Sequence, residues 1–279
     1  MIFNYLLCFT ALGGINLLGL TSEQIAEKAF PASVMLVLFD ETGQAVKSGS
    51  GFFVSPNVVA TNYHVVENTS GGVVKFLGRS SVSKIENVVA VNPTFDIALL
   101  QIDKTSPVKL DLGDSKNLKI GQSVYVVGNP QGLEGTFSNG LVSSIRKFGE
   151  DYLVQMTAPI SSGSSGGPVL DNSGKVIGVS VGMVQGGQNL NFAIPSEYVV
   201  SLLKLVEDKK FSRSYTSSRT KDFFSPTLSL SSELIQENHN KEKKYVSTIH
   251  KLEFLDHSRG STNKKGKENT TDNIFIMSR

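Results

Sequence analysis

Between residues 32 and 194 the chain offers only short apolar segments, most of them with the period of two that is typical of β-strands. Turns rich in glycine or asparagine separate these segments, and no stretch of about 12 residues has the helical period. This pattern predicts an all-β fold of the antiparallel barrel or sandwich class. The predicted strands are residues 33–39, 49–54, 57–61, 73–77, 84–91, 97–102, 123–127, 138–146, 152–157, 168–170, 175–183 and 190–194.

Two short helices are predicted to flank the β-region. Thr21 and Gln24 have the spacing of a capping box, so a helix begins there, and Pro31 ends it. Pro195, followed by Ser196 and Glu197, opens a closing helix whose apolar residues recur at helical spacing. Those apolar residues are Tyr198, Val199, Leu202, Leu203 and Val206.

The two ends of the chain differ from its middle. Residues 1–20 carry no charged side chain and are interpreted as a signal peptide or a membrane anchor. They contain no Lys or Arg and no clear A-x-A cleavage site, so a buried or disordered N-terminus stays open as an alternative. Residues 211–279 include 19 Ser or Thr, which predicts a polar, basic, disordered tail. The folded domain is therefore predicted over residues 21–210.

Charge and cysteine content exclude several classes of function. Residues 1–210 contain 15 Lys or Arg against 17 Asp or Glu, whereas the tail contains 12 against 8. A nucleic-acid binder concentrates basic residues on its folded part, so no nucleic-acid partner is predicted. Cys8 is the only cysteine, so the chain has neither an internal disulfide nor a thiolate metal cluster. We expect no metal and no cofactor.

The segment from Gly163 to Pro168, GSSGGP, is the sharpest local motif. Taken alone it is equally typical of a flexible turn rich in glycine and serine. A serine hydroxyl becomes a nucleophile only when a base removes its proton and N–H donors stabilise the resulting oxyanion. Glycines around Ser165 allow a tight loop in which the backbone amides of Gly163 and Ser165 converge. We therefore interpret Ser165 as a candidate nucleophile and these two amides as a candidate oxyanion hole.

A base and an orienting carboxylate have one strong candidate each. His64 is the only histidine of the predicted folded domain, because the other three lie in the tail. Asp96 is flanked by apolar residues, where a carboxylate is costly to bury unless a partner requires it. In a catalytic triad Asp96 would hold the imidazole tautomer of His64 and stabilise the imidazolium formed during attack. A satisfied structural histidine and a turn aspartate are the competing interpretations.

The same segment also fits the G-x-S-x-G elbow of α/β-hydrolases, with Ser165 at its centre. That fold requires a helix after the serine and the chain order Ser, acid, His. Here Ser165 is followed by two glycines, Pro168 and more β-pattern, and the later histidines lie in the tail. The observed order His64, Asp96, Ser165 excludes the elbow and is the order of chymotrypsin-type proteases.

In these residues the chain resembles the trypsin-fold serine proteases of the HtrA/Deg type over about residues 22–206. The resemblance rests on the ordered blocks SGSGFFVSPNVVATNYHVVEN, DIALLQID, LGDSKNLKIGQSVYVVGNPQGL, GLVSSIRK, APISSGSSGGPVLDNSGKVIGVSVG and NFAIPSEYV. It implies two antiparallel six-stranded barrels with the active site between them. It further implies that Ser165 is the nucleophile, His64 the general base and Asp96 the orienting residue, with the oxyanion hole at Gly163 and Ser165.

The resemblance also implies how a substrate would bind. The strand at Val179, Ser180, Val181 and Gly182 would pair with the substrate backbone, and Ile160 and Met183 would belong to the wall of the S1 pocket. Digestive trypsins have an aspartate six residues before the nucleophile, where this chain has Pro159. We therefore expect cleavage after apolar P1 residues (Val, Ile, Ala or Leu) and not after Lys or Arg.

Two departures from the family pattern change what is expected. Ser164 stands where most HtrA relatives have asparagine, and no trypsin-type activation sequence is present, so regulation is expected through ordering of the loop around residues 129–138. The tail is too short and too polar for the PDZ domain that relatives usually carry. The implied homo-oligomer is the trimer common in the family. The implied location is extracytoplasmic, periplasmic or secreted, with membrane association through residues 1–20.

These features favour a serine endopeptidase that cleaves unfolded or exposed protein segments through an acyl-enzyme, as in HtrA-like protein quality control. The alternative from the class of binding proteins is an adaptor or holdase that uses the protease fold to hold peptides with little hydrolysis. A third interpretation is a scaffold whose basic tail docks on anionic membranes.

Overall fold

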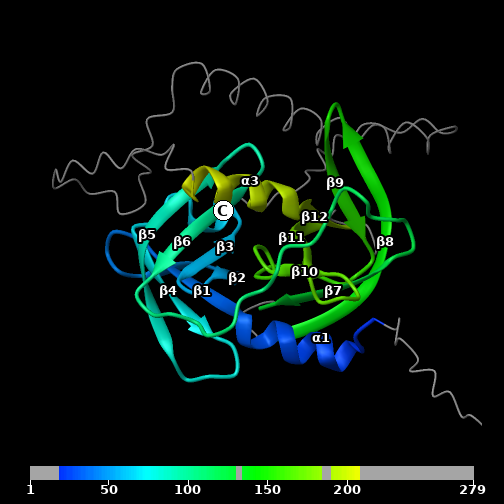
Figure 1. Cartoon of the computed structure of the whole chain (residues 1–279). Coiled ribbons are helices and arrows are strands. Elements are labelled where there is room, and N and C mark those ends of the chain that lie inside the picture. The colour runs from blue at the N-terminus through cyan, green and yellow to red at the C-terminus, as the bar shows by residue number, and fades with distance from the viewer. Residues whose placement is uncertain (1–18, 130–133, 184–189, 208–279) are drawn as a thin grey trace, which may run out of the picture.

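The alternating apolar pattern of the sequence forms two closed antiparallel barrels (Figure 1), described here for residues 19–129, 134–183 and 190–207 of a computed structural model. The order of strands in the first barrel is β1-β2-β3-β6-β5-β4. Its strands are β1 (Ser33–Phe39), β2 (Ala45–Ser55), β3 (Val58–Thr61), β4 (Gly71–Phe76), β5 (Val82–Asn92) and β6 (Ile97–Ile102). Pairing of β1 with β4 closes this barrel and leaves no free edge.

The second barrel has the order β10-β11-β12-β9-β8-β7. Its strands are β7 (Ser123–Gly128), β8 (Thr136–Phe148), β9 (Asp151–Met156), β10 (Pro168–Leu170), β11 (Val176–Met183) and β12 (Asn191–Pro195). All twelve predicted strands are confirmed, three of them with the predicted bounds: residues 33–39, 97–102 and 168–170. The prediction of two six-stranded antiparallel barrels is therefore confirmed as well.

Each barrel is filled by the inward-facing residues of its strands. In β1, for example, Val34, Leu36 and Leu38 are completely buried in the first barrel, while the residues between them are partly exposed. A third apolar cluster joins the two barrels and includes Phe52 and Val127. Because apolar burial is the main stabilising term in folding, this shared cluster holds the barrels together.

Short helices cover the junction between the barrels on two sides (Figure 1). Helix α1 (Ser22–Ala29) begins with the predicted Thr21–Gln24 capping box and buries Ile25 and Ala29 in the shared cluster. A 3₁₀ turn (Phe30–Ala32) containing Pro31 follows it. Helix α3 (Ser196–Glu207) packs against β5 and β6 of the first barrel and β11 and β12 of the second. Among the described residues no helix is long and apolar enough to cross a membrane.

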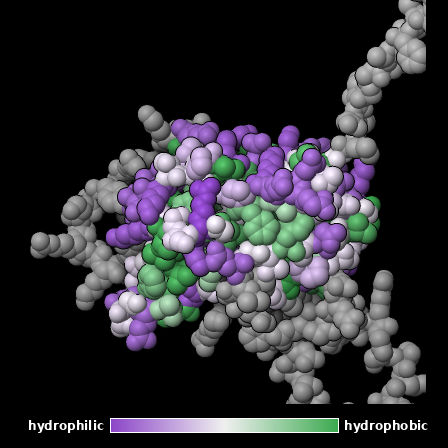
Figure 2. All heavy atoms as spheres, turned by 90° about the horizontal axis from the view of Figure 1, so that it is seen from below, coloured by the Kyte–Doolittle hydropathy of each residue, from purple (hydrophilic) through white to green (hydrophobic). Residues whose placement is uncertain are grey.

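The surface on the side of α1 mixes hydrophilic and hydrophobic side chains (Figure 2). Large apolar side chains that are exposed over the described ranges are spread over several elements: Leu20, Val46, Val82, Ile120, Leu141 and Leu205. The predicted leader, apart from its last two residues, and the predicted tail lie outside the described residues. Their interpretation therefore remains a prediction.

Candidate active site

His64 lies on the four-residue helix α2 (Tyr63–Val66), which follows β3. Val65 and Val66 are buried in the first barrel and anchor the helix there. The preceding residue, Asn62, is extended, and its side chain does not cap the helix. The sequence analysis placed His64 after a strand but missed this helix, because four residues ending in two β-branched valines carry no helical periodicity.

Asp96 binds His64 at two points. The backbone N–H of His64 donates to Oδ1 of Asp96 at 2.7 Å, and Nδ1 of the imidazole lies 2.7 Å from Oδ2. The side chains of His64 and Asp96 are only 12% and 15% exposed. Because a carboxylate can only accept a hydrogen bond, Nδ1 carries the proton and Nε2 is the basic nitrogen of the ring.

The backbone of Asp96 has a left-handed conformation, with φ of 51°. This region is unfavourable for most residues other than glycine, although aspartate and asparagine enter it more readily. Its carbonyl oxygen accepts hydrogen bonds from the Tyr63 amide at 3.1 Å and from Nδ2 of Asn62 at 2.9 Å. The neighbouring Phe95 stacks on Tyr198 of α3, with 3.7 Å between the ring centroids. These contacts fix a turn that would otherwise be strained, and they hold the carboxylate beside the imidazole.

Ser165 lies in the loop between β9 and β10, where the two barrels meet. Its carbonyl oxygen accepts from the amide of Ser50 at 2.8 Å, and its hydroxyl donates to the carbonyl of Val181 at 3.2 Å. Gly49 fills the narrow space between this loop and helix α2. A Cβ on Gly49 would lie 2.7 Å from Cγ1 of Val65 and 3.3 Å from the Ser165 carbonyl oxygen. The structure therefore brings the backbone of Ser165 close to helix α2, the helix that carries His64.

The glycines that follow Ser165 are required by close packing. Gly166 has φ of +87°, and a Cβ there would collide with the Ser50 carbonyl and the Thr61 hydroxyl of the first barrel. A Cβ on Gly167 would collide with the Val127 carbonyl of the second barrel. The G-G pair lets the loop enter the space between the barrels, which a side chain would block.

Ser50 connects the first barrel to the loop that carries Ser165. Its hydroxyl donates to the carbonyl of Gly163 at 2.7 Å and accepts from the backbone amide of Asn129 at 3.0 Å. The side-chain amide of Asn129 reaches both the Ser50 hydroxyl and the carbonyl of Val34, each at 3.1 Å. Ser50 and Asn129 are almost fully buried, so these hydrogen bonds fix the orientation of the peptide between Gly163 and Ser164.

Two backbone amides of this loop remain available for an external acceptor. The Ser164 amide is occupied, since it donates to the carbonyl of Ser161 at 2.9 Å. Within the described ranges, neither the Gly163 amide nor the Ser165 amide donates a hydrogen bond. Gly163 has φ of +92°, which favours glycine at this position. These are the two donors that the sequence analysis assigned to the oxyanion hole.

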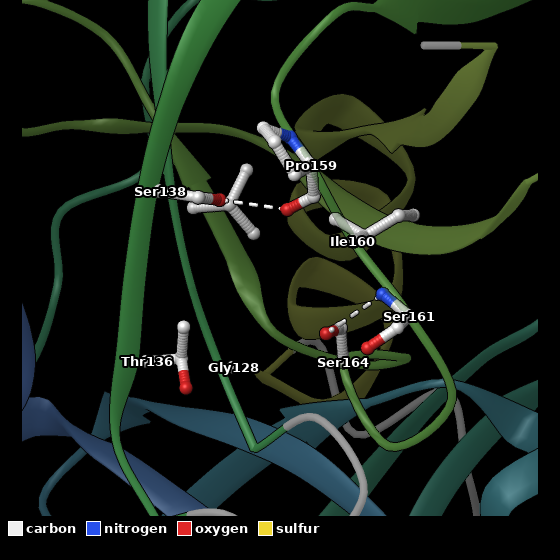
Figure 3. A pocket seen from close by; sticks show the side chains of 8 residues that line it. Gly128, Thr136, Ser138, Pro159, Ile160, Ser161 and Ser164 are labelled. Atoms are coloured by element: carbon white, nitrogen blue, oxygen red, sulfur yellow. Dashed lines mark hydrogen bonds between the residues drawn. The ribbon is translucent and has the colours of Figure 1, made fainter. Parts of the chain in front are cut away.

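A pocket of about 200 Å³ opens beside this loop (Figure 3). The Ser138 hydroxyl donates to the Pro159 carbonyl at 2.8 Å, and the Ser161 amide donates to Oγ of Ser164 at 3.3 Å. These two hydroxyls in the pocket wall therefore each have a hydrogen-bond partner within the protein. None of the lining side chains is charged. They are Val126, Gly128, Thr136, Ser138, Pro159, Ile160, Ser161 and Ser164. The predicted wall residue Ile160 is among them.

Comparison with known proteins assigns this arrangement to a family. The model of the trypsin-like peptidase domain matches residues 49–179, which contain His64, Asp96 and Ser165. A probable periplasmic serine endoprotease, DegP-like, from Rickettsia conorii is 35% identical over 188 residues, which make up 62% of this chain and 37% of that protein. The crystal structure of the serine endoprotease from Yersinia pestis matches with a TM-score of 0.60 and 26% identity, covering 68% of each chain. The chain contains a trypsin-like peptidase domain that is similar to the serine proteases of the HtrA/Deg type.

The similarity is to the shared protease domain. The anti-sigma-I factor RsgI9 from Acetivibrio thermocellus is 33% identical over 180 residues, which cover 64% of this chain but 25% of that protein. The chain therefore spans about a quarter to two fifths of the length of these curated relatives. This part of the chain is thus also similar to a protein that is named as an anti-sigma factor.

In this HtrA/Deg-type domain the predicted substrate strand divides into two parts. Val179 pairs with Pro168 on one side and Ile194 on the other, and Ser180 exchanges backbone hydrogen bonds with the loop after Ser165. Val181 and Gly182 are half-buried, and they lie at and just beyond an irregularity in the pairing of β11 with β12. Within the described residues Gly182 and Met183 pair with β12 alone, so this part of the predicted substrate strand has one edge without a paired strand. The Met183 side chain lies outside the described residues, so its place in the S1 wall remains a prediction.

Sequence reasoning missed several residues that shape the site. Ser50 and Asn129 lie in quoted blocks of the resemblance, but neither carries a local signal of its contact with the Gly163 loop. Thr136 and Ser138 line the pocket because β8 crosses it, which is a consequence of the folded barrel. Part of the loop expected to regulate the site, residues 130–133, lies outside the described residues.

Proposed function

We propose that this chain is a serine endopeptidase that hydrolyses unfolded or exposed protein segments outside the cytoplasm through an acyl-enzyme. The observation that carries the proposal is the pair of hydrogen bonds between Asp96 and His64, which leaves Nε2 as the basic nitrogen of the His64 ring. The available amides of Gly163 and Ser165 and the uncharged pocket beside them support the same assignment.

In the proposed reaction Nε2 of His64 removes the hydroxyl proton of Ser165 while Oγ attacks the scissile carbonyl carbon. The amides of Gly163 and Ser165 donate to the oxyanion that forms. The imidazolium then returns the proton to the leaving amine as the C–N bond breaks, and an acyl group remains on Oγ. Water, deprotonated by His64, hydrolyses this ester, and the proton returns to Oγ. Throughout, Asp96 stabilises the imidazolium.

The reaction requires one rearrangement of the resting site. The Ser165 hydroxyl donates to the Val181 carbonyl, so a rotation about the Cα–Cβ bond must direct it to Nε2 of His64. Such a side-chain rotation is fast compared with typical turnover.

A covalent probe tests the proposed function directly. We expect a fluorophosphonate to label the native chain at Ser165, as located by mass spectrometry of the modified peptide, and the same protein to digest unfolded casein. Heat-denatured protein is the control, because labelling depends on the folded arrangement of His64 and Ser165. Tight peptide binding without any labelling would contradict the proposal and would support the adaptor alternative.

The pocket predicts the residue after which cleavage occurs. It is small, its wall contains Val126 and Ile160, and Pro159 occupies the position of the trypsin aspartate. We expect kcat/KM to be at least about 100-fold higher for peptides with Val, Ile, Ala or Leu at P1 than for Lys or Arg, because burying an unpaired cation costs several kcal/mol. A panel of matched fluorogenic peptides that differ only at P1 measures this ratio. Preferred cleavage after Lys or Arg would contradict the assignment of the pocket as S1.

The cellular setting remains part of the proposal. The location outside the cytoplasm is supported by the periplasmic description of the DegP-like relative. The role in protein quality control, the membrane association through residues 1–20 and the trimer are carried over from the family resemblance alone.

A further inference from the structure

The helix that carries His64 has little stability of its own. Helix α2 is four residues long, and the amide of its C-cap residue, Glu67, donates to the Tyr63 carbonyl at 2.9 Å. The side chain of its N-cap residue, Asn62, makes no capping hydrogen bond. Isolated helices of this length do not persist in water, because nucleation costs more than one hydrogen bond returns. The position of His64 therefore depends on contacts from outside the helix.

One of these outside contacts comes from Asp96, described above, which accepts from the His64 backbone N–H. The other comes from Lys47 on β2, 17 residues before His64 in the chain. The ammonium of Lys47 donates to the carbonyl of His64 at 2.9 Å and to the carbonyl of Glu67 at 2.7 Å. The backbone of His64 is thus held at its N–H by a carboxylate and at its C=O by an ammonium.

The environment of Lys47 indicates that this contact is specific. The side chain is partly buried, and loss of water around the ammonium lowers the pKa of Lys47 from its ordinary value. The negative charges of Glu67 and Asp96 act in the opposite direction and favour the charged form. An ammonium also interacts favourably with the carbonyls at the C-terminal end of a helix. Lys47 therefore combines a helix cap with a counter-charge for Asp96.

We propose that Lys47 is a positioning residue for His64, which fixes the imidazole relative to Ser165 through the backbone of helix α2. This inference rests on the proposed endopeptidase function. When Lys47 is removed, the carbonyls of His64 and Glu67 lose their donor and the last turn of the helix loosens. A displacement of about 1 Å of a catalytic group can cost about 100-fold in rate, so a partial loosening has a measurable effect on turnover.

The test compares Lys47→Met with a matched control, Lys104→Met, in the full chain. Lys104 follows β6 of the first barrel and also donates to a backbone carbonyl, that of Val82 at 2.5 Å, and within the described residues no hydrogen bond joins it to α2. For Lys47→Met we expect kcat to fall about 10-fold, with KM within about twofold of the wild type. For Lys104→Met we expect both constants to stay within about twofold of the wild type.

A pH profile distinguishes positioning from a general loss of stability. Among the described residues, the charged groups that interact beside His64 are Lys47 and the carboxylates of Asp96 and Glu67, which act on Lys47, and Tyr63 precedes His64 in sequence. Removing the only cation of this group moves the acidic limb of the kcat profile to higher pH, by about half a unit. We expect Lys47→Arg to restore the position of this limb and most of kcat, because a guanidinium can also bind two carbonyls. The unfolding midpoint of each variant is measured in parallel.

The inference is overturned if kcat of Lys47→Met stays within about twofold of the wild type, or if Lys104→Met loses as much. It is also overturned if Lys47→Met only lowers the unfolding midpoint, with an unmoved acidic limb and no rescue by Lys47→Arg. The low-field NMR resonance of the His64 Nδ1 proton provides a readout that does not require turnover. We expect this resonance to shift or broaden in Lys47→Met and not in Lys104→Met. A wild-type chain that is neither labelled nor active refutes the proposed function, while this NMR comparison still decides the role of Lys47.

Discussion

Replacing Ser165 with alanine is expected to lower kcat by about 10⁵- to 10⁶-fold and to abolish fluorophosphonate labelling. In the proposed mechanism the Ser165 hydroxyl forms the acyl bond, and its loss leaves His64 without this proton to remove. The residual rate stays above that of the uncatalysed reaction, because the amides of Gly163 and residue 165 can still bind an oxyanion. Single-turnover assays with a peptide ester measure both the loss of rate and the residual rate.

The structure of the Ser165→Ala variant should be the same as that of the wild type. The Ser165 hydroxyl makes one hydrogen bond, 3.2 Å long, so its removal changes the free energy of unfolding by about 1 kcal/mol or less. Ser173→Ala is the matched control, since Ser173 occupies an exposed turn of the same barrel and, among the residues that the structure describes, bonds only to Asp171. Equal peptide hydrolysis by Ser165→Ala and the wild type would mean that another group is the nucleophile.

Replacing Asp96 with asparagine should lower kcat by about 10⁴-fold while leaving the fold intact. Asparagine accepts the left-handed backbone at this position, so the turn is kept. The amide, however, has only one acceptor oxygen, and Asp96 accepts from His64 with both of its oxygens. In either orientation an NH₂ group faces a His64 nitrogen. When it faces Nδ1, the ring takes the tautomer that protonates Nε2 and can no longer act as a base.

Asp103→Asn provides the control for this second prediction. Asp103 directly follows β6, the strand that Asp96 precedes, and accepts from the Ser83 hydroxyl and the Lys84 amide on the first barrel. Its replacement removes the same charge without touching His64, so kcat should stay within about twofold of the wild type. If both variants lost activity equally, net charge and not the orientation of the imidazole would explain the effect of Asp96→Asn.

The strands were predictable because each needs only local information. Alternation such as that of β1 fixes both the period and the buried face, and glycine or asparagine turns mark the ends. The predicted bounds differ from the observed ones mostly where a strand continues beyond its apolar residues. For example, β2 begins at Ala45, four residues before the predicted start, because its exposed first residues still pair with β1.

The reactive groups of the candidate site could be predicted from the sequence, whereas the residues that hold them in place could not. His64, Asp96 and Ser165 were singled out because the folded part contains one histidine, an aspartate enclosed by apolar residues and a serine in the glycine-rich segment GSSGGP. Helix α2 and Lys47 did not, because a four-residue helix has no period and a lysine in a strand normally indicates a solvated face. Their roles arise from contacts between segments that only the folded barrel brings together.

The hydrogen bonds of Ser50 indicate which displacement within the molecule would disrupt the candidate site. One half of the molecule supplies the imidazole and also, through a single buried hydroxyl, sets the shape of the loop in the other half that supplies the attacking oxygen. In the proposed mechanism, activity then depends more on the alignment of the two barrels than on the stability of either barrel. A ligand or a neighbouring molecule that moved the two barrels apart by about 1 Å would lower the rate about 100-fold while every strand stayed folded.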